Sequence, residues 1–180
     1  MKTTRTAVLL GCVLAAGGAG AYQNPGVLGD IRDIADDLEK GKDVKKKVAA
    51  LKAKEPDVYE VMQAFRARAK GGIGYGPKGI GIEAKIAELA RRALTKDALA
   101  KEGAELARML HLNRAMARIV HEYAPAKPRP GKANAAQWKG FAADQDKAAN
   151  GMLDAIRKGD PALLKKKSLD LSKACNDCHR

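Results

Sequence analysis

Apolar residues recur along this chain at the spacing of amphipathic helices. Val58, Met62 and Phe65, for example, stand at positions i, i+4 and i+7, which places them on one face of a helix. Valine and isoleucine are scattered, and no segment alternates between apolar and polar residues as a half-buried strand would. Alanine, leucine, lysine and glutamate dominate, and these residues favour helices. The pattern therefore predicts an all-α protein with negligible sheet.

Signals at helix ends divide the chain into segments. Pro56 fits a first helical position, Thr95 fits an N-cap, and Asp160 fits an N-cap that is followed by Pro161. Together with the apolar spacing, these signals predict helices over 27–54 (as one or two segments), 56–69, 83–94, 95 to about 123, 134–158 and 161 to the end. The inward positions of the last helix form a heptad-like series: Leu164, Ser168, Leu171, Cys175 and Cys178.

Residues 71–82 form a glycine-rich loop, GGIGYGPKGIGI. Gly74, Gly76 and Gly79 match the pattern G-x-G-x-x-G, but no strand precedes them and no βαβ unit surrounds them, so a dinucleotide site is rejected. A phosphate-binding P-loop is rejected because Lys78 is followed by Gly79 and not by serine or threonine. The favoured interpretation is a flexible connector, and the alternative is a close-packed loop at the edge of a cofactor.

The first 21 residues have the layout of a signal peptide. Lys2 and Arg5 precede an apolar stretch from Ala7 to Ala16, and residues 19–21 form an A-x-A cleavage site. The pattern predicts a periplasmic or otherwise exported protein with no transmembrane span after cleavage. Residues 9–12 also resemble a lipobox that would lipidate Cys12, but the apolar stretch before Cys12 is short, so the lipoprotein is the less favoured form.

Composition narrows the choice of partner and of core. Aromatic residues make up only 4% of the 180 residues, so a core of alanine and leucine would be thin unless a large apolar cofactor helped to fill it. The formal net charge of +13 predicts an acidic partner or an anionic surface. No base-stacking aromatics stand among the lysines, so we expect no nucleic acid.

The strongest motif lies at the end of the chain, where residues 175–179 read Cys-Asn-Asp-Cys-His. Signal cleavage would remove Cys12 and leave Cys175 and Cys178 as the two remaining cysteines. C-x-x-C-H is the attachment signature of c-type haem. On a helix, Cys175, Cys178 and His179 stand at i, i+3 and i+4, so the thiols can bond the two vinyl groups while the imidazole reaches the iron. The motif predicts one covalent haem c.

Other uses of this motif fit the sequence less well. A zinc site would need two further ligands from His111 and His121, which are ten residues apart and lack the usual spacing. A thioredoxin-like redox pair would need a βαβ context. A plain disulfide between Cys175 and Cys178 would leave His179 unexplained.

With these features the chain resembles the class II c-type cytochromes, the cytochrome c-prime family. The resemblance covers residues 95–180: a long helix, a proline-rich loop, a helix with inward Trp138 and Phe141, a turn at residues 159–161 and a final helix that carries the haem motif. Residues 58–62 resemble the family's first bundle helix. The resemblance implies a four-helix bundle over 55–180, to which a helical extension at 22–54 and the loop at 71–82 are added.

The family resemblance also suggests the ligand on the far side of the iron. The family's distal residue lies on the first bundle helix, and Met62 is the residue here that would occupy it, although a methionine at helical spacing more often packs in a core. The rivals on the long helix are His111, His121, Met109 and Met116. Arg66 and Arg68 lie about one turn beyond Met62 and could pair with the haem propionates, or be ordinary solvated arginines.

The sixth ligand separates the functions that the resemblance implies. With a Met62 ligand we expect a non-enzymatic one-electron carrier that serves an acidic redox partner. With His179 as the sole protein ligand, the alternative is a five-coordinate protein of the cytochrome c-prime type that binds NO or CO. A third alternative is a domain that uses haem only for structure. A homodimer is left open.

Overall fold

The computed structural model describes residues 25–127 and 133–179. The predicted signal peptide, Cys12, Pro128 and Pro130 lie outside these residues. Within them the chain is all-α, as predicted, and has no β-strand. No helix in these ranges is long and apolar enough to cross a membrane. The elements are α1 (Pro25–Glu39), α2 (Lys45–Ala53), α3 (Val58–Met62), the 3₁₀ turns η1 (Gln63–Phe65) and η2 (Arg68–Lys70), α4 (Ile82–Arg91), α5 (Lys96–His121), α6 (Ala135–Arg157) and α7 (Pro161–Cys178).

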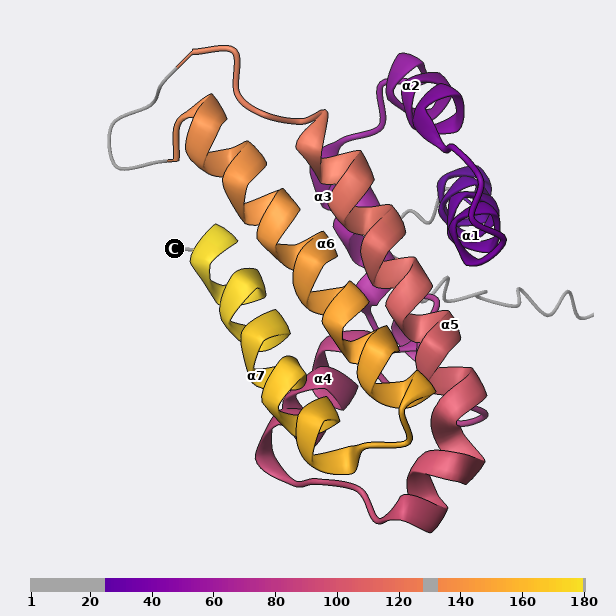
Figure 1. The fold of residues 1–180 in the computed structure, drawn as a ribbon. Helices are drawn as coiled ribbons and strands as arrows, with labels where there is room; N and C mark the ends of the chain where they lie inside the picture. Colours follow the sequence, from indigo (N-terminus) through magenta and orange to yellow (C-terminus); the bar gives the residue numbers. More distant parts are fainter. Residues whose placement is uncertain (1–24, 128–132, 180) are drawn as a thin grey trace, which may run out of the picture.

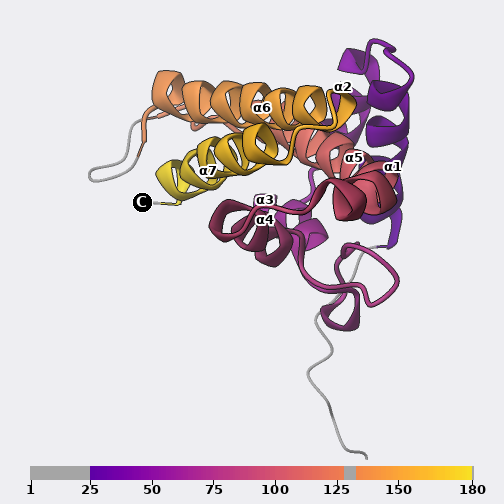
Figure 2. The same ribbon diagram turned by 60° about the horizontal axis from the view of Figure 1, so that its bottom comes forward.

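The three longest C-terminal helices form the body of the molecule. Helix α6 packs between α5 and α7, and the three run side by side (Figure 1). Helix α4 packs on α7, and Figure 2 shows α3 and α4 together on one side of this layer. The largest fully buried side chains of the layer are Leu106, Leu110, Met116, Ile119, Met152, Leu164 and Leu171.

Helix ends in this layer follow the predicted signals. The Thr95 hydroxyl accepts a hydrogen bond from the backbone N–H of Ala98 at the start of α5. The Asp160 carboxylate accepts from two backbone N–H groups at the start of α7, and Pro161 holds the first helical position. These caps satisfy N–H groups that have no partner within the helix, so the bounds of α5 and α7 are largely set by local sequence.

The N-terminal extension consists of two helices, within the range predicted for residues 27–54. Ile31 and Ile34 of α1 are buried against α5, and α2 buries Val48 and Leu51. The pair α1–α2 lies on the α5 side of the layer, away from α7 (Figure 1). The extension therefore adds to the same core and does not form a separate one.

The prediction of a helix over residues 56–69 is wrong in its length, because the helix in the structure is much shorter. Helix α3 ends at Met62, and Arg66 is extended at φ −67° and ψ 163°. Non-local hydrogen bonds explain the early end. The N–H of Arg68, which would bond Ala64 in a continued helix, donates to the carbonyl of Gly79 at 2.8 Å, and the Ala64 carbonyl accepts from Ile73 at 3.0 Å. Pro56 also precedes the N-cap, Asp57, and so lies outside the helix.

The glycine-rich loop is close-packed and is not the loose connector that was favoured. Residues 71–76 are buried, and Tyr75 and Ile80 exchange backbone hydrogen bonds at 2.7 and 3.1 Å. A Cβ on Gly72 would stand 2.0 Å from the carbonyl oxygen of Arg66, so only glycine fits there without a backbone shift. The loop thus packs closely against the segment that follows α3 and is hydrogen-bonded to it.

A buried lysine and a half-buried glutamate fix this loop to the helices on either side. The Glu102 carboxylate of α5 accepts from the Tyr75 hydroxyl and from the Lys85 ammonium, both at 2.9 Å. Burial, followed by the Glu102 contact, raises the pKa of Tyr75 well above its usual range, so the phenol stays protonated and acts as a donor. The Lys85 contact is the main reason that the pKa of Glu102 is lowered. This network joins the loop, α4 and α5.

Candidate functional site

A pocket of about 500 Å³ lies where the end of α7 faces α3, and α5 and α6 form its sides. The residues predicted for the site, on segments more than a hundred positions apart in the sequence, all line this one pocket. These are Cys175, Cys178, His179, Met62 and Arg66. The complete lining is Val58, Tyr59, Met62, Gln63, Phe65, Arg66, Glu83, Met116, Val120, Trp138, Gln145, Cys175, Cys178 and His179.

The last turn of α7 places the three residues of the C-x-x-C-H motif. Cys175 packs against the core, Cys178 is half-buried, and His179 is exposed at the helix end. The backbone N–H of His179 donates to the Asn176 carbonyl at 3.2 Å, which continues the turn past the last helical residue. The spacing i, i+3, i+4 therefore places all three side chains at the pocket, as the sequence predicted.

Both cysteines are free thiols, and burial keeps them protonated. Burial raises the pKa of Cys175 to about 11, with smaller contributions from the charges of Glu83 and Cys178. Burial also raises the pKa of Cys178. The thiols are therefore neutral near pH 7, the form that costs least in an apolar pocket. No disulfide joins them in the structure.

Two methionines line the same pocket. Met62 of α3 is half-buried, and Met116 of α5 is fully buried. The other three candidates lie elsewhere: Met109 and His111 line a second cavity, and His121 is half-buried, lines a third cavity and lies 3.0 Å from Glu122. The structure thus reduces the candidate distal ligands at this pocket to Met62 and Met116.

The two arginines after α3 have different surroundings. The Arg66 guanidinium lines the pocket and donates to the Tyr59 hydroxyl at 2.8 Å. The pKa of Tyr59 is lowered, first by its hydrogen bond with Gln63 and then by Arg66. Arg68, by contrast, donates to the carbonyls of Gly76 and Pro77 in the glycine-rich loop. Only Arg66 is therefore placed to meet an anionic group at the pocket.

The side walls contain polar groups that are already paired. The Trp138 indole N–H donates to the Val120 carbonyl at 2.6 Å. The Gln145 amide donates to Asn113 Oδ1 at 2.8 Å, which explains how a polar residue fits the buried stripe of α5. Phe141, predicted to point inward with Trp138, is half-buried and is not part of the lining. The walls therefore offer mainly ring and aliphatic surface.

Sequence reasoning gave no role at the site to Tyr59, Gln63, Glu83 or Gln145, and it ranked Met116 below Met62. The spacing of seven residues does place Gln145 on the same face as Trp138 of the predicted 134–158 helix, but it gives Gln145 no chemical role. No sequence signal points to Glu83, because α4 reaches the pocket only through its packing on α7.

The glycine-rich loop contributes no residue to the pocket lining, so it does not form the edge of this site directly. Within residues 25–127 and 133–179, no three His, Cys, Asp or Glu side chains cluster closely enough to hold a metal ion. The chain matches no protein-family model, no curated protein and no solved structure.

Proposed function

We propose that this protein is an exported c-type cytochrome that carries single electrons on one haem c bound through Cys175 and Cys178. One observation carries the proposal: the two thiols and the imidazole of the C-x-x-C-H motif line one largely apolar pocket together with Met62 and Met116. The C-x-x-C-H spacing is what covalent attachment of haem requires of the two thiols and the imidazole.

The pocket residues fit a haem in size and in character. Its volume of about 500 Å³ falls within the 300–1,000 Å³ typical of cofactor sites. Val58, Phe65, Val120 and Trp138 supply apolar walls, and Arg66 supplies a cation for a carboxylate. Each thiol can add across one vinyl group, with its proton passing to the vinyl carbon, so the attachment needs no oxidant. When bound, the haem supplies a one-electron Fe(III)/Fe(II) couple.

The residues of the pocket would set the properties of that couple. His179 would bind the iron from the α7 side, and a methionine thioether would bind from the other side and favour Fe(II). We assign that role to Met62, because it is half-buried at the pocket whereas Met116 is fully enclosed in the core. A thioether ligand favours an electron carrier, since an occupied site resists NO and CO.

The remaining parts of the proposal are the family, the compartment and the partner. Helices α3, α5, α6 and α7 supply the walls of the pocket, which supports a four-helix bundle of the class II type with α3 as a shortened first helix. The signal-like residues 1–21 support export to the periplasm. The formal charge of +13 supports an acidic redox partner.

The experiment is expression with export in a host that has a haem-ligation system, followed by acid–acetone extraction. The wild-type protein should remain red, and the Cys175→Ala/Cys178→Ala variant should lose its colour to the solvent. Cys12→Ala is the matched control, because Cys12 is the one cysteine of the sequence outside the C-x-x-C-H motif. This variant should remain red. Complete loss of colour from the wild type would refute covalent attachment. If the wild-type protein is high-spin and binds CO rapidly, the electron-carrier function would be refuted in favour of the gas-binding function.

A further inference from the structure

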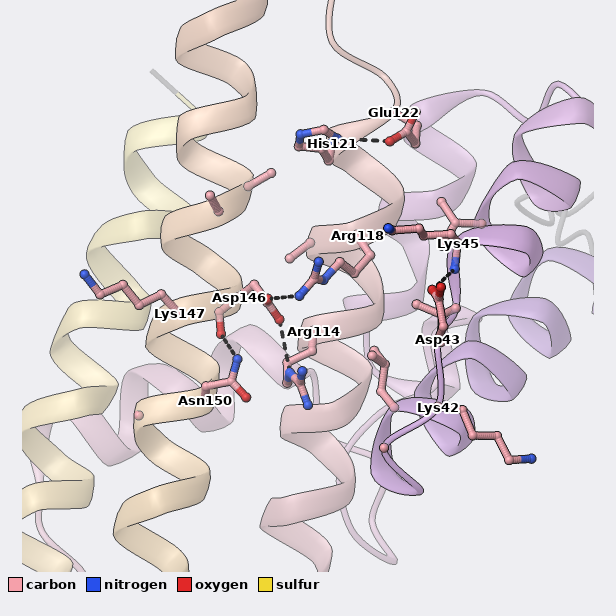
Figure 3. A pocket seen from close by; sticks show the side chains of 18 of the residues that line it. Lys42, Asp43, Lys45, Arg114, Arg118, His121, Glu122, Asp146, Lys147 and Asn150 are labelled. Atoms are coloured by element: carbon pink, nitrogen blue, oxygen red, sulfur yellow. Dashed lines mark hydrogen bonds and ion pairs between the residues drawn. The ribbon is translucent and has the colours of Figure 1, made fainter.

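A third cavity, larger than the haem pocket, lies on the other side of the α5–α6 pair. This groove has a volume of about 1360 Å³ and runs between α5–α6 and the α1–α2 connection (Figure 3). The haem pocket uses Met116 and Val120 of α5, whereas the groove uses Arg114, Ala117 and Arg118. Because these two sets lie on different faces of one helix, an occupant of the groove would leave the haem pocket open.

The size and the floor of the groove suit a helix. Its volume exceeds the 300–1,000 Å³ of small-ligand sites. A helix of about 10 Å diameter that filled it would be about three turns long. Small residues in its lining form what we call its floor and let a helix backbone approach closely: Ala49, Ala117, Ala142 and Ala143.

The charges along the groove favour an acidic occupant. Arg114 and Arg118 both bond the Asp146 carboxylate, at 3.1 and 2.6 Å, so this triad carries a net positive charge and has N–H donors to spare (Figure 3). Among the described residues, Lys45 and Lys147 make no ion pair, although both line the groove.

The acidic side chains that line the groove have partners already. The Asp43 carboxylate accepts from the backbone N–H of Lys45 at 2.9 Å. Glu122 lies 3.0 Å from His121, and Asp154 pairs with Arg157. Six lysines and arginines and four aspartates and glutamates line the groove, so its formal net charge is +2, and carboxylates on an incoming helix would complement it.

We propose that this groove binds an amphipathic helix of a partner protein, with small apolar residues on the buried face and carboxylates on its flanks. The mode is helix-in-groove recognition, in which residues at i, i+3, i+4 and i+7 enter the floor. The proposal does not depend on haem, since none of the groove residues belongs to the C-x-x-C-H pocket. Docking here would hold the partner on the opposite side of the α5–α6 pair from the haem pocket and would leave that pocket uncovered.

The probe is a fluorescent, stapled helical peptide of three turns, with alanine and leucine on one face and glutamates on both flanks. Binding to the exported full-length protein is followed by fluorescence anisotropy at low ionic strength. Lys45→Glu/Arg118→Glu should weaken binding at least tenfold, and Ala143→Trp, which fills the exposed side of the floor, should abolish it. Lys96→Glu/Lys139→Glu makes the same change in net charge at exposed residues outside the groove and should bind like the wild type.

Three results would overturn the proposal. The first is no binding of the acidic peptide, or equal binding of a peptide with lysines in place of the glutamates. The second is equal weakening in the two charge variants, which would indicate attraction to net charge alone. The third is a homodimer in sedimentation that Ala143→Trp dissociates, because a second copy would then occupy the groove. The Cys175→Ala/Cys178→Ala protein should bind the peptide unchanged, so failure of the haem assignment and failure of this one are distinguishable.

Discussion

The two opposing walls of the pocket are built in different ways. The attachment wall, at the end of α7, is a regular helix whose spacing alone puts Cys175, Cys178 and His179 on one side. The distal wall, residues 58–66, is one short helix and a 3₁₀ turn whose course is set by hydrogen bonds from the glycine-rich loop. The attachment wall is therefore robust to changes elsewhere, and the distal wall depends on residues that never touch the pocket.

Of the changes that test this difference between the two walls, Gly72→Ala should have the largest effect. The new Cβ would stand 2.0 Å from the Arg66 carbonyl oxygen, so the distal wall must move. We expect a loss of about 2–4 kcal/mol in the free energy of unfolding and a changed iron-ligation spectrum, while the haem stays covalently bound. Gly140→Ala on α6 is the control, because nothing lies within 4 Å of its Cβ position. Thermal unfolding and a visible spectrum of each variant would measure both effects. An unchanged spectrum in Gly72→Ala would show that the loop does not control the distal wall.

The next effect separates the two methionines. Met62→Ala should convert the ferric haem toward high spin, admit CO and lower the potential, because the thioether that favours Fe(II) is gone. Met116→Ala should cost about 2–5 kcal/mol of stability, since Met116 is fully buried, and leave the ligation spectrum unchanged. Visible spectra with and without CO, together with thermal unfolding, distinguish the two. The reverse result, in which only Met116→Ala changes the spectrum, would move the ligand to α5.

The attachment wall can be probed through its thiols. In the apoprotein with Cys178→Ala, Cys175 should react with iodoacetamide at pH 8 about 10–100-fold more slowly than in the urea-unfolded chain. The reaction is slower in the folded chain because the thiolate is the reactive form. Burial raises the pKa of Cys175 to about 11, so less thiolate is present at any lower pH. The rate should rise with pH toward that value. Equal rates in the folded and unfolded chains would mean that the end of α7 is open to solvent.

The smallest effect concerns the charged surface around both walls. Electron transfer to an acidic redox protein should slow by about tenfold as ionic strength rises from 10 to 200 mM, because salt screens the steering by the basic surface. The rate with a small neutral oxidant is the control and should hardly change. If the rate with the acidic protein does not change with ionic strength, the positive charge does not steer this partner and instead serves solubility or binding to an anionic surface.

The same contrast explains what the sequence could predict. The all-α class, the caps at Thr95 and Asp160 and the grouping of the C-x-x-C-H side chains depend on neighbours within four residues, so local spacing was enough. The length of α3 depends on hydrogen bonds that reach from Arg68 to Gly79 and from Ala64 to Ile73, and no periodic pattern reports those.

The composition of the pocket shows the same division. Met62 and Arg66 were predicted from a family resemblance and do line the pocket, whereas Glu83 reaches it only because α4 packs on α7. The glycine-rich loop was interpreted as a connector because glycine indicates only that the backbone needs freedom. Its role as a packed clasp follows from the close approach of Gly72 to Arg66, which a sequence cannot show.

The most direct test of the haem assignment is the intact mass of the exported protein under denaturing conditions. We predict a single species equal to the mature chain plus one haem, because both thiols add across vinyl groups and no atoms are lost. The Cys175→Ala/Cys178→Ala chain should show the bare mass, and each single variant should retain one thioether. If the wild-type chain, after export in a host that has a haem-ligation system, shows no added mass, covalent haem attachment is contradicted.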